Sequence, residues 1–93
     1  MQVFFHPDFY PVYISDPAAA KGRMEAIVRV IEPHVTFVAA EAADDADVAA
    51  VHTPAHIEYV RDSGVYPVAL LAAGGTVQAA ELSLTEPCMA LVR

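Results

Sequence analysis

Four histidines are the chain's most obvious candidates for chemistry, because imidazole binds metals and exchanges protons near neutral pH. His52 and His56 are four residues apart in the sequence HTPAH, a spacing that places two imidazoles on one helix face and occurs in zinc sites. Thr53-Pro54, however, is a helix-start pattern between them, and no Glu follows the first His as a general base. We therefore interpret the pair as structural, with His52 hydrogen-bonded to backbone at a helix junction, and expect no metal site.

Two further histidines occur where turns are expected. His6-Pro7-Asp8 follows an expected strand, at the end where α/β proteins place their sites, and can orient a loop or a ligand. We expect no direct catalytic role for it. His34 follows Pro33 in a turn and is expected to be exposed.

The remaining candidates have simple structural interpretations. Asp44, Asp45 and Asp47 could suggest cation binding, but helix capping and complementarity to the helix dipole explain them better. Cys88, the only cysteine, lies beside an expected buried strand and fits a small core residue rather than a nucleophile. The sequence therefore predicts no catalytic residue and no metal ligand in this chain.

Arg23 is the most informative charge. It stands at the start of an expected amphipathic helix and close in sequence to an aromatic loop that contains Phe9, Tyr10 and Tyr13. The plain interpretation is a solvated cation at the helix start. A positive charge in the first turn is disfavoured by the helix dipole, which leaves room for a functional reason.

Composition narrows the classes of function. The chain of 93 residues carries 12 acidic and five basic residues, a net charge of −7, and lacks the basic patch that nucleic-acid binding needs. With 56% hydrophobic and 18% charged residues, it predicts one packed domain. No run approaches the ~18 apolar residues of a membrane span. A single cysteine and a start without signal-peptide features favour a reducing, cytoplasmic setting.

The hydrophobic pattern predicts strands alternating with helices. The expected strands are Gln2–His6, Val35–Val38 and Met89–Val92. The expected helices run from near Lys21 to the stop at Pro33, from Asp44-Asp45 through Val51, from Thr53-Pro54 to about Ser63, and over Val68–Leu84. This order predicts a parallel sheet with right-handed crossovers. The connector Ala39–Ala43 shows no informative pattern.

The helix expected over Val68–Leu84 is apolar almost all round, so it must pack against other elements. Its Gly74-Gly75 pair costs roughly 1 kcal/mol per glycine in a helix. The expected use of the pair is to let another backbone approach closely. The pair lacks the G-x-G-x-x-G pattern of a dinucleotide loop.

Several stretches, in order, resemble the zinc-dependent histone deacetylase and acetylpolyamine amidohydrolase superfamily. Val3–Pro7 (VFFHP) looks like its first strand and following loop, and Arg23–Ile27 (RMEAI) like its Arg-led first helix. Val51–Val60 (VHTPAHIEYV) is similar to the family's VHT-x-x-(H/Y)-I-x-x-V segment and is the most specific match. Ala69–Gly75 and Ala90–Arg93 (ALVR) resemble the helix and strand that follow.

The resemblance implies a fold, a chemistry and one site residue. The fold would be the N-terminal part of an arginase/deacetylase-like α/β domain, with strand order 2-1-3 and flanking helices. In the family, the strand resembling ALVR leads into a Pro-Pro-Gly-His-His loop, and the zinc ligands come later still. Of the family's functional positions, only Arg23 is matched: an arginine that lines an internal channel and is proposed for acetate release. Its context here, AAAKGR, departs from the common Pro-Glu-Arg-Pro.

Two functions are therefore expected as alternatives. In the first, residues 1–93 are the N-terminal piece of an acetyl-lysine or acetylpolyamine amidohydrolase, inactive alone and without a cofactor of its own, whereas zinc serves the full-length family. In the second, the chain is a small non-catalytic oligomeric interaction module derived from that fold. A homo-oligomer is expected through the edge strand Met89–Val92 or the Val68–Leu84 helix, and no nucleic-acid or membrane partner is expected.

Overall fold

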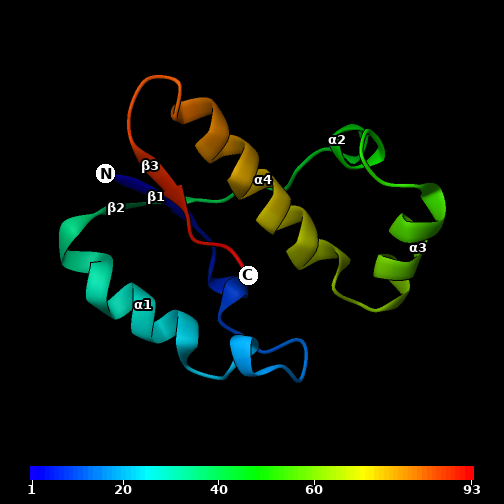
Figure 1. The fold of residues 1–93 in the computed structure, drawn as a ribbon, viewed down its shortest axis with the longest axis horizontal. Helices are drawn as coiled ribbons and strands as arrows, with labels where there is room; N and C mark the ends of the chain where they lie inside the picture. Colours follow the sequence, from blue (N-terminus) through cyan, green and yellow to red (C-terminus); the bar gives the residue numbers. More distant parts are fainter.

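The computed structural model describes all residues, Met1–Arg93, and has a three-stranded parallel sheet with helices on both faces. Strands β1 (Gln2–Phe5), β2 (Thr36–Ala39) and β3 (Cys88–Ala90) lie in the order β2-β1-β3. Helix α4 covers one face and α1 lies on the other, with the sheet seen nearly edge-on between them (Figure 1). The predicted α/β class, parallel sheet and strand order 2-1-3 are confirmed.

The central strand β1 is buried on both faces. Val3 pairs with Phe37 of β2 and Met89 of β3, and it has no exposed surface, while Phe4 is 6% exposed. Successive side chains of a strand point to opposite faces, so both layers of helices need apolar partners from this strand. The run of consecutive apolar residues in β1 follows from this two-sided burial.

Helix α1 (Arg23–Ile31) begins two residues later than expected. Gly22 precedes it with a φ of 86°, a left-handed conformation that glycine adopts without steric cost. Upstream of it, Ser15-Asp16-Pro17 also has the capping side chain and proline that predict a helix start. This pattern produces only a short 3-10 turn, Pro17–Ala19, in which the Asp16 carboxylate accepts from the Ala18 N–H. Met24 is the fully buried anchor of α1 in the core, as the helical spacing predicts.

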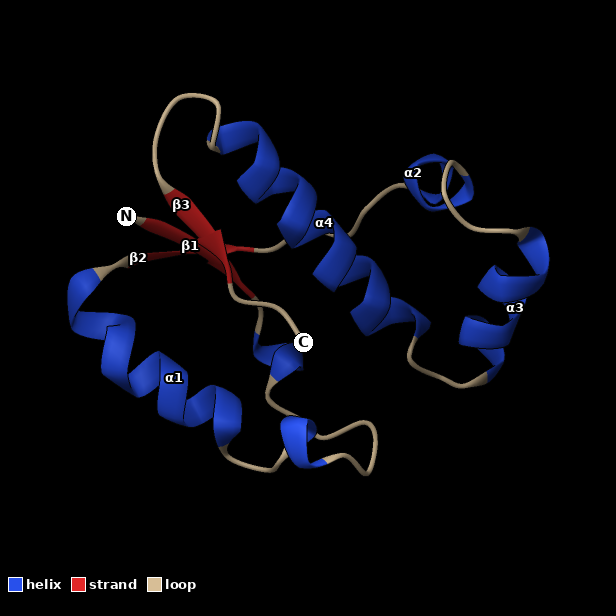
Figure 2. Cartoon of the chain, in the orientation of Figure 1, coloured by secondary structure: helices blue, strands red, loops and turns tan.

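Helix α4 (Tyr66–Leu82) is the longest element and lies diagonally across the sheet (Figure 2). Its two glycines are the points of closest approach. A Cβ atom at Gly74 would lie 1.7 Å from the carbonyl oxygen of Glu41, and one at Gly75 would lie 3.1 Å from the Cβ of Ala40. The expected close approach of another backbone at this pair is confirmed.

The connector Ala39–Ala43, which showed no sequence pattern, is the backbone that approaches. The Ala43 N–H donates to the Leu70 carbonyl at 2.9 Å. The Gln78 side-chain amide accepts from the Glu41 N–H at 2.9 Å and donates to the Ala39 carbonyl at 3.3 Å. This segment is therefore fixed on α4. Its course is determined by Gly74 and Gln78 of that helix and not by a pattern in its own sequence.

Two short helices, α2 (Asp45–Ala49) and α3 (Pro54–Asp62), stand apart from the sheet beyond the N-terminal end of α4 (Figure 1). The Thr53 hydroxyl caps α3 by accepting from the His56 N–H at 3.2 Å, and Gly64 ends it with a φ of 81°. Helix α2 is two residues shorter than expected. None of the helices has the length and apolar character that a membrane span needs.

Strand β3 forms one edge of the sheet. It begins one residue earlier and ends two residues earlier than the expected Met89–Val92. Its contact with β1 continues past the strand, because the Leu91 N–H donates to the Phe4 carbonyl at 2.9 Å. Leu91 is buried and Val92 partly buried, so the apolar character of the whole run is explained by packing.

Candidate functional site

The largest candidate site is a pocket of about 430 Å³ beside the C-terminal residues that follow β3. Its volume is in the range of small-molecule sites. Most of the lining is hydrophobic, and three charged residues complete it. The lining residues are Tyr13, Ile14, Asp16, Ala18, Ala19, Arg23, Val65, Val68, Ala69, Val92 and Arg93. We call this the arginine pocket.

Arg93 builds one wall of the arginine pocket by joining two loops. Its guanidinium donates to the carbonyl of Phe9 at 3.1 Å and also to the carbonyl of Ala19. These acceptors belong to separate segments, the short 3-10 turn Pro7–Phe9 after β1 and the turn before α1. Both loops are thus held against the chain that leaves β3. Sequence reasoning missed Arg93, although a cation directly after a buried strand end was a usable signal.

Arg23 contributes the second guanidinium. It is the first residue of α1 and is exposed, and its only side-chain hydrogen bond is the one that its guanidinium donates to the sulfur of Met24 at 3.5 Å. Neither guanidinium lies within ion-pairing distance of a carboxylate. The positive end of the α1 dipole adds to the same local potential. Two of the chain's five basic residues therefore line one pocket without a carboxylate partner.

Asp16 is the one acid in the lining. Its carboxylate accepts from the Ala18 N–H at 2.7 Å and caps the turn Pro17–Ala19. The carboxylate is thus engaged by backbone rather than by either guanidinium. The arrangement can bind an anion that has an apolar body, because guanidinium forks match carboxylate oxygens and the walls are apolar.

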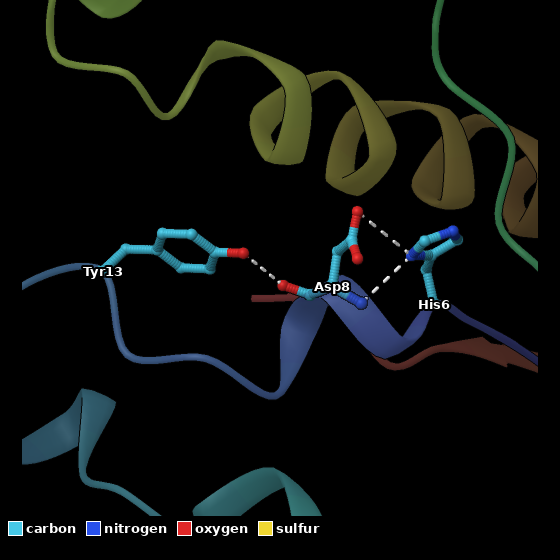
Figure 3. A network of polar contacts seen from close by, with 3 residues as sticks. All are labelled: His6, Asp8 and Tyr13. Atoms are coloured by element: carbon cyan, nitrogen blue, oxygen red, sulfur yellow. Dashed lines mark hydrogen bonds and ion pairs between the residues drawn. The ribbon is translucent and has the colours of Figure 1, made fainter.

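His6 orients the loop that carries part of the pocket wall. Its Nδ1 accepts from the Asp8 N–H at 3.0 Å, and the Tyr13 hydroxyl donates to the Asp8 carbonyl at 2.6 Å (Figure 3). An Nδ1 that accepts carries no proton, so its 3.6 Å approach to the Asp8 carboxylate is not an ion pair while that bond is made. Of the two roles considered for His6-Pro7-Asp8, orienting a loop or a ligand, these bonds fit the first, and His6 does not line the pocket.

The structure brings His52 and His56 together. Their ring centroids are 4.9 Å apart, and His56 in turn stacks on Tyr59 at 6.4 Å. His52 lies outside α3, as expected, but its imidazole makes none of the backbone hydrogen bonds that we predicted. The reason is that the ring packs against the neighbouring imidazole instead. His34 is exposed, as expected.

The acidic cluster and the cysteine have structural contacts. Asp44 precedes α2 without a side-chain capping bond, and Asp45 instead accepts from the Tyr66 hydroxyl at 3.0 Å. The capping expected of Asp44 is thus replaced by a tie between α2 and α4. The thiol of Cys88 is half-buried and donates to the Ala79 carbonyl at 3.1 Å, so it joins β3 to α4.

Neither a metal centre nor a relative identifies the site. No three His, Cys, Asp or Glu side chains come close enough to share a metal ion. No protein-family model, curated protein sequence or solved structure matches the chain. The candidate site therefore rests on the geometry of the arginine pocket.

Proposed function

We propose that residues 1–93 form the N-terminal part of a histone deacetylase-like α/β fold and that the arginine pocket binds a small carboxylate, the acyl product of such an enzyme. The resemblance of VFFHP, RMEAI, VHTPAHIEYV and ALVR supports the family. The strand order β2-β1-β3 agrees with the expected fold. The cytoplasmic setting expected from the sequence is part of this proposal.

The observation that carries the proposal is the convergence of Arg23 and Arg93, neither of them ion-paired, on one apolar pocket. A guanidinium offers a planar pair of donors that fits a carboxylate. Apolar walls such as Val68 and Val92 lower the local dielectric and strengthen that attraction. A pocket of about 430 Å³ has room for an acyl chain longer than acetate.

The proposal assigns no zinc site to residues 1–93. The residues present do not fit a zinc site, because His52 and His56 meet without a third ligand and structural or catalytic zinc needs three or four protein ligands. The proposal therefore gives residues 1–93 the sheet and the product pocket, and no step at a metal.

A titration with butyrate tests the proposal. We expect sodium butyrate, at ionic strength held constant with sodium chloride, to shift the amide NMR signals of Ala18, Ala19 and Ala69 in ¹⁵N-labelled protein. In Arg23→Ala, the loss of a charge-assisted hydrogen bond, worth about 1.5–3 kcal/mol, should weaken binding roughly tenfold or more.

Arg29→Ala is the matched control, because Arg29 is exposed on the same helix and does not line the pocket. It should leave the butyrate affinity unchanged. The proposal fails if chloride alone reproduces the shifts, or if Arg29→Ala weakens binding as much as Arg23→Ala does.

A second candidate function is the small oligomeric interaction module. Two surfaces support it, the edge strand β3 and the outer face of α4, where Val77 and Leu84 are exposed. Homo-oligomer formation through one of these surfaces would show as a mass above that of the monomer, whether or not the arginine pocket binds butyrate.

A further inference from the structure

The outer face of α4 carries an apolar stripe with alternating spacings of three and four residues. Its members are Leu70, Ala73, Val77, Ala80 and Leu84. Gly75 contacts Phe4 and Val92, and Ala79 accepts from the Cys88 thiol, so the sheet side of the helix is the opposite one. Alternating steps of three and four are the spacing of a helix-pairing seam.

Four of the five stripe residues are exposed in the single chain, and Leu70 is partly buried. Val77 is 41% exposed and Leu84 is 86% exposed. Leu84 lies two residues beyond α4, but its N–H donates to the Glu81 carbonyl at 3.3 Å and the helical turn continues. Glu81 is the only charged residue of α4. The chain has a net charge of −7, yet its longest helix carries only this one charge, which is exposed beside the stripe four residues after Val77.

The order of residue sizes along the stripe identifies the occupant. On each side of Val77, the next side chain of the stripe is small and the one after it is large. These are Ala73 and Leu70 on one side, and Ala80 and Leu84 on the other. A two-fold axis needs a surface that is complementary to itself. Two antiparallel copies centred on Val77 place Leu70 against Leu84 and Ala73 against Ala80, so that each alanine makes room for close approach.

We infer that the outer face of α4 is an isologous interface, in which a second copy of this chain packs its own α4 antiparallel across Val77. This inference specifies the surface of the interaction module and does not depend on the arginine pocket.

A hollow beside the stripe fits the projecting leucine. It has a volume of about 160 Å³ and separates α4 from α2 and α3. Its apolar lining includes Leu70 and Ala73 of the stripe with Val48, Ile57 and Val60 opposite. This volume is below the 300–1,000 Å³ typical of small-molecule pockets. In the antiparallel pair, Leu84 of each copy lies beside Leu70 of the other, at the mouth of this hollow.

Edge pairing at β3 is the competing interface. It offers only Cys88–Ala90, and the backbone groups of alternate residues already face β1. So short an edge is a poor template for another strand. Edge pairing at β3 is the alternative outcome of the experiment described next.

Sedimentation equilibrium of the full chain tests the inference with a matched pair of variants. Wild-type protein should show about twice the 9.9 kDa of one chain. Val77→Glu should reduce the mass to that of the monomer. Val30→Glu, a change to the same residue type at a 71% exposed valine of α1, should leave the dimer intact. Because like-charged copies repel and salt screens them, dimerisation should strengthen as sodium chloride is raised.

Cross-linking keeps the inference testable if Val77→Glu does not fold. In a Cys88→Ser background, Val77→Cys should be cross-linked into dimers by a short bismaleimide, and Val30→Cys should not. A monomeric wild type, a dimer that survives Val77→Glu, or equal cross-linking at both positions would overturn the inference. Survival of the dimer in Val77→Glu would point to β3.

Discussion

The two arginines of the arginine pocket differ in what each guanidinium contacts. Arg93 donates to two loop carbonyls, whereas Arg23 has only the Met24 sulfur as a partner. The sequence singled out Arg23 from its disfavoured position at a helix start. Its position directly after a buried strand marked Arg93 as well, but the Phe9 and Ala19 carbonyls that accept from it could not be predicted, because they are far away in sequence and are ordinary backbone groups.

We predict that Arg93→Ala destabilises the fold by about 1–3 kcal/mol, because two partly buried carbonyls lose their donor. The measurement is the free energy of unfolding from urea denaturation. Arg29→Ala, which removes an exposed arginine, should change that free energy by less than about 0.5 kcal/mol. Equal effects of the two substitutions would show that the contacts of Arg93 with the loops contribute nothing to stability.

At the scale of elements, the sequence predicted the strands and helices well and their partners less well. Helical spacing located α1, continuous apolar runs located β1 and α4, and the Thr53-Pro54 cap with the Gly64 stop located α3. The connector Ala39–Ala43 carried no pattern, since its position depends on Gly74 and Gln78 of a helix about 35 residues away. The 3-10 turn at Pro17–Ala19 begins with the same cap-and-proline pattern as a helix. The later Gly22 is the only sequence feature that distinguishes this turn from a helix start.

Gly74→Ala should be severely destabilising despite the better helix propensity of alanine. The new Cβ would meet the Glu41 carbonyl oxygen at 1.7 Å, so the connector must leave α4 or the helix must shift. We expect a loss of about 3 kcal/mol, the upper part of the range for overpacking, in the free energy of unfolding measured in urea.

Thr76→Ala on the exposed side of the same helix is the control. Thr76 donates its hydroxyl to the Ala72 carbonyl, and its replacement should change stability by less than about 0.5 kcal/mol. Gly75→Ala should fall between the two, because its new Cβ would lie 3.1 Å from the Ala40 side chain. A Gly74→Ala protein as stable as the wild type would show that the connector does not approach α4 as closely as described.

At the scale of the whole molecule, charge is distributed unevenly. The net charge is −7, but Arg23 and Arg93 line the arginine pocket and the outer face of α4 is almost uncharged. Acidic residues elsewhere repel anions at long range, whereas the pocket attracts one at contact. Raising the ionic strength should therefore weaken carboxylate binding, because Arg23 is exposed and salt screens exposed charges.

The central claim is that the arginine pocket holds a carboxylate with its apolar chain against Val68 and Val92. Isotope-filtered NMR with ¹³C-labelled butyrate tests it most directly. The account predicts nuclear Overhauser contacts from the butyrate methyl group to the methyl groups of Val68 and Val92, and their loss in Arg23→Ala but not in Arg29→Ala. Contacts only to residues outside the pocket, or contacts that persist in Arg23→Ala, would contradict the account.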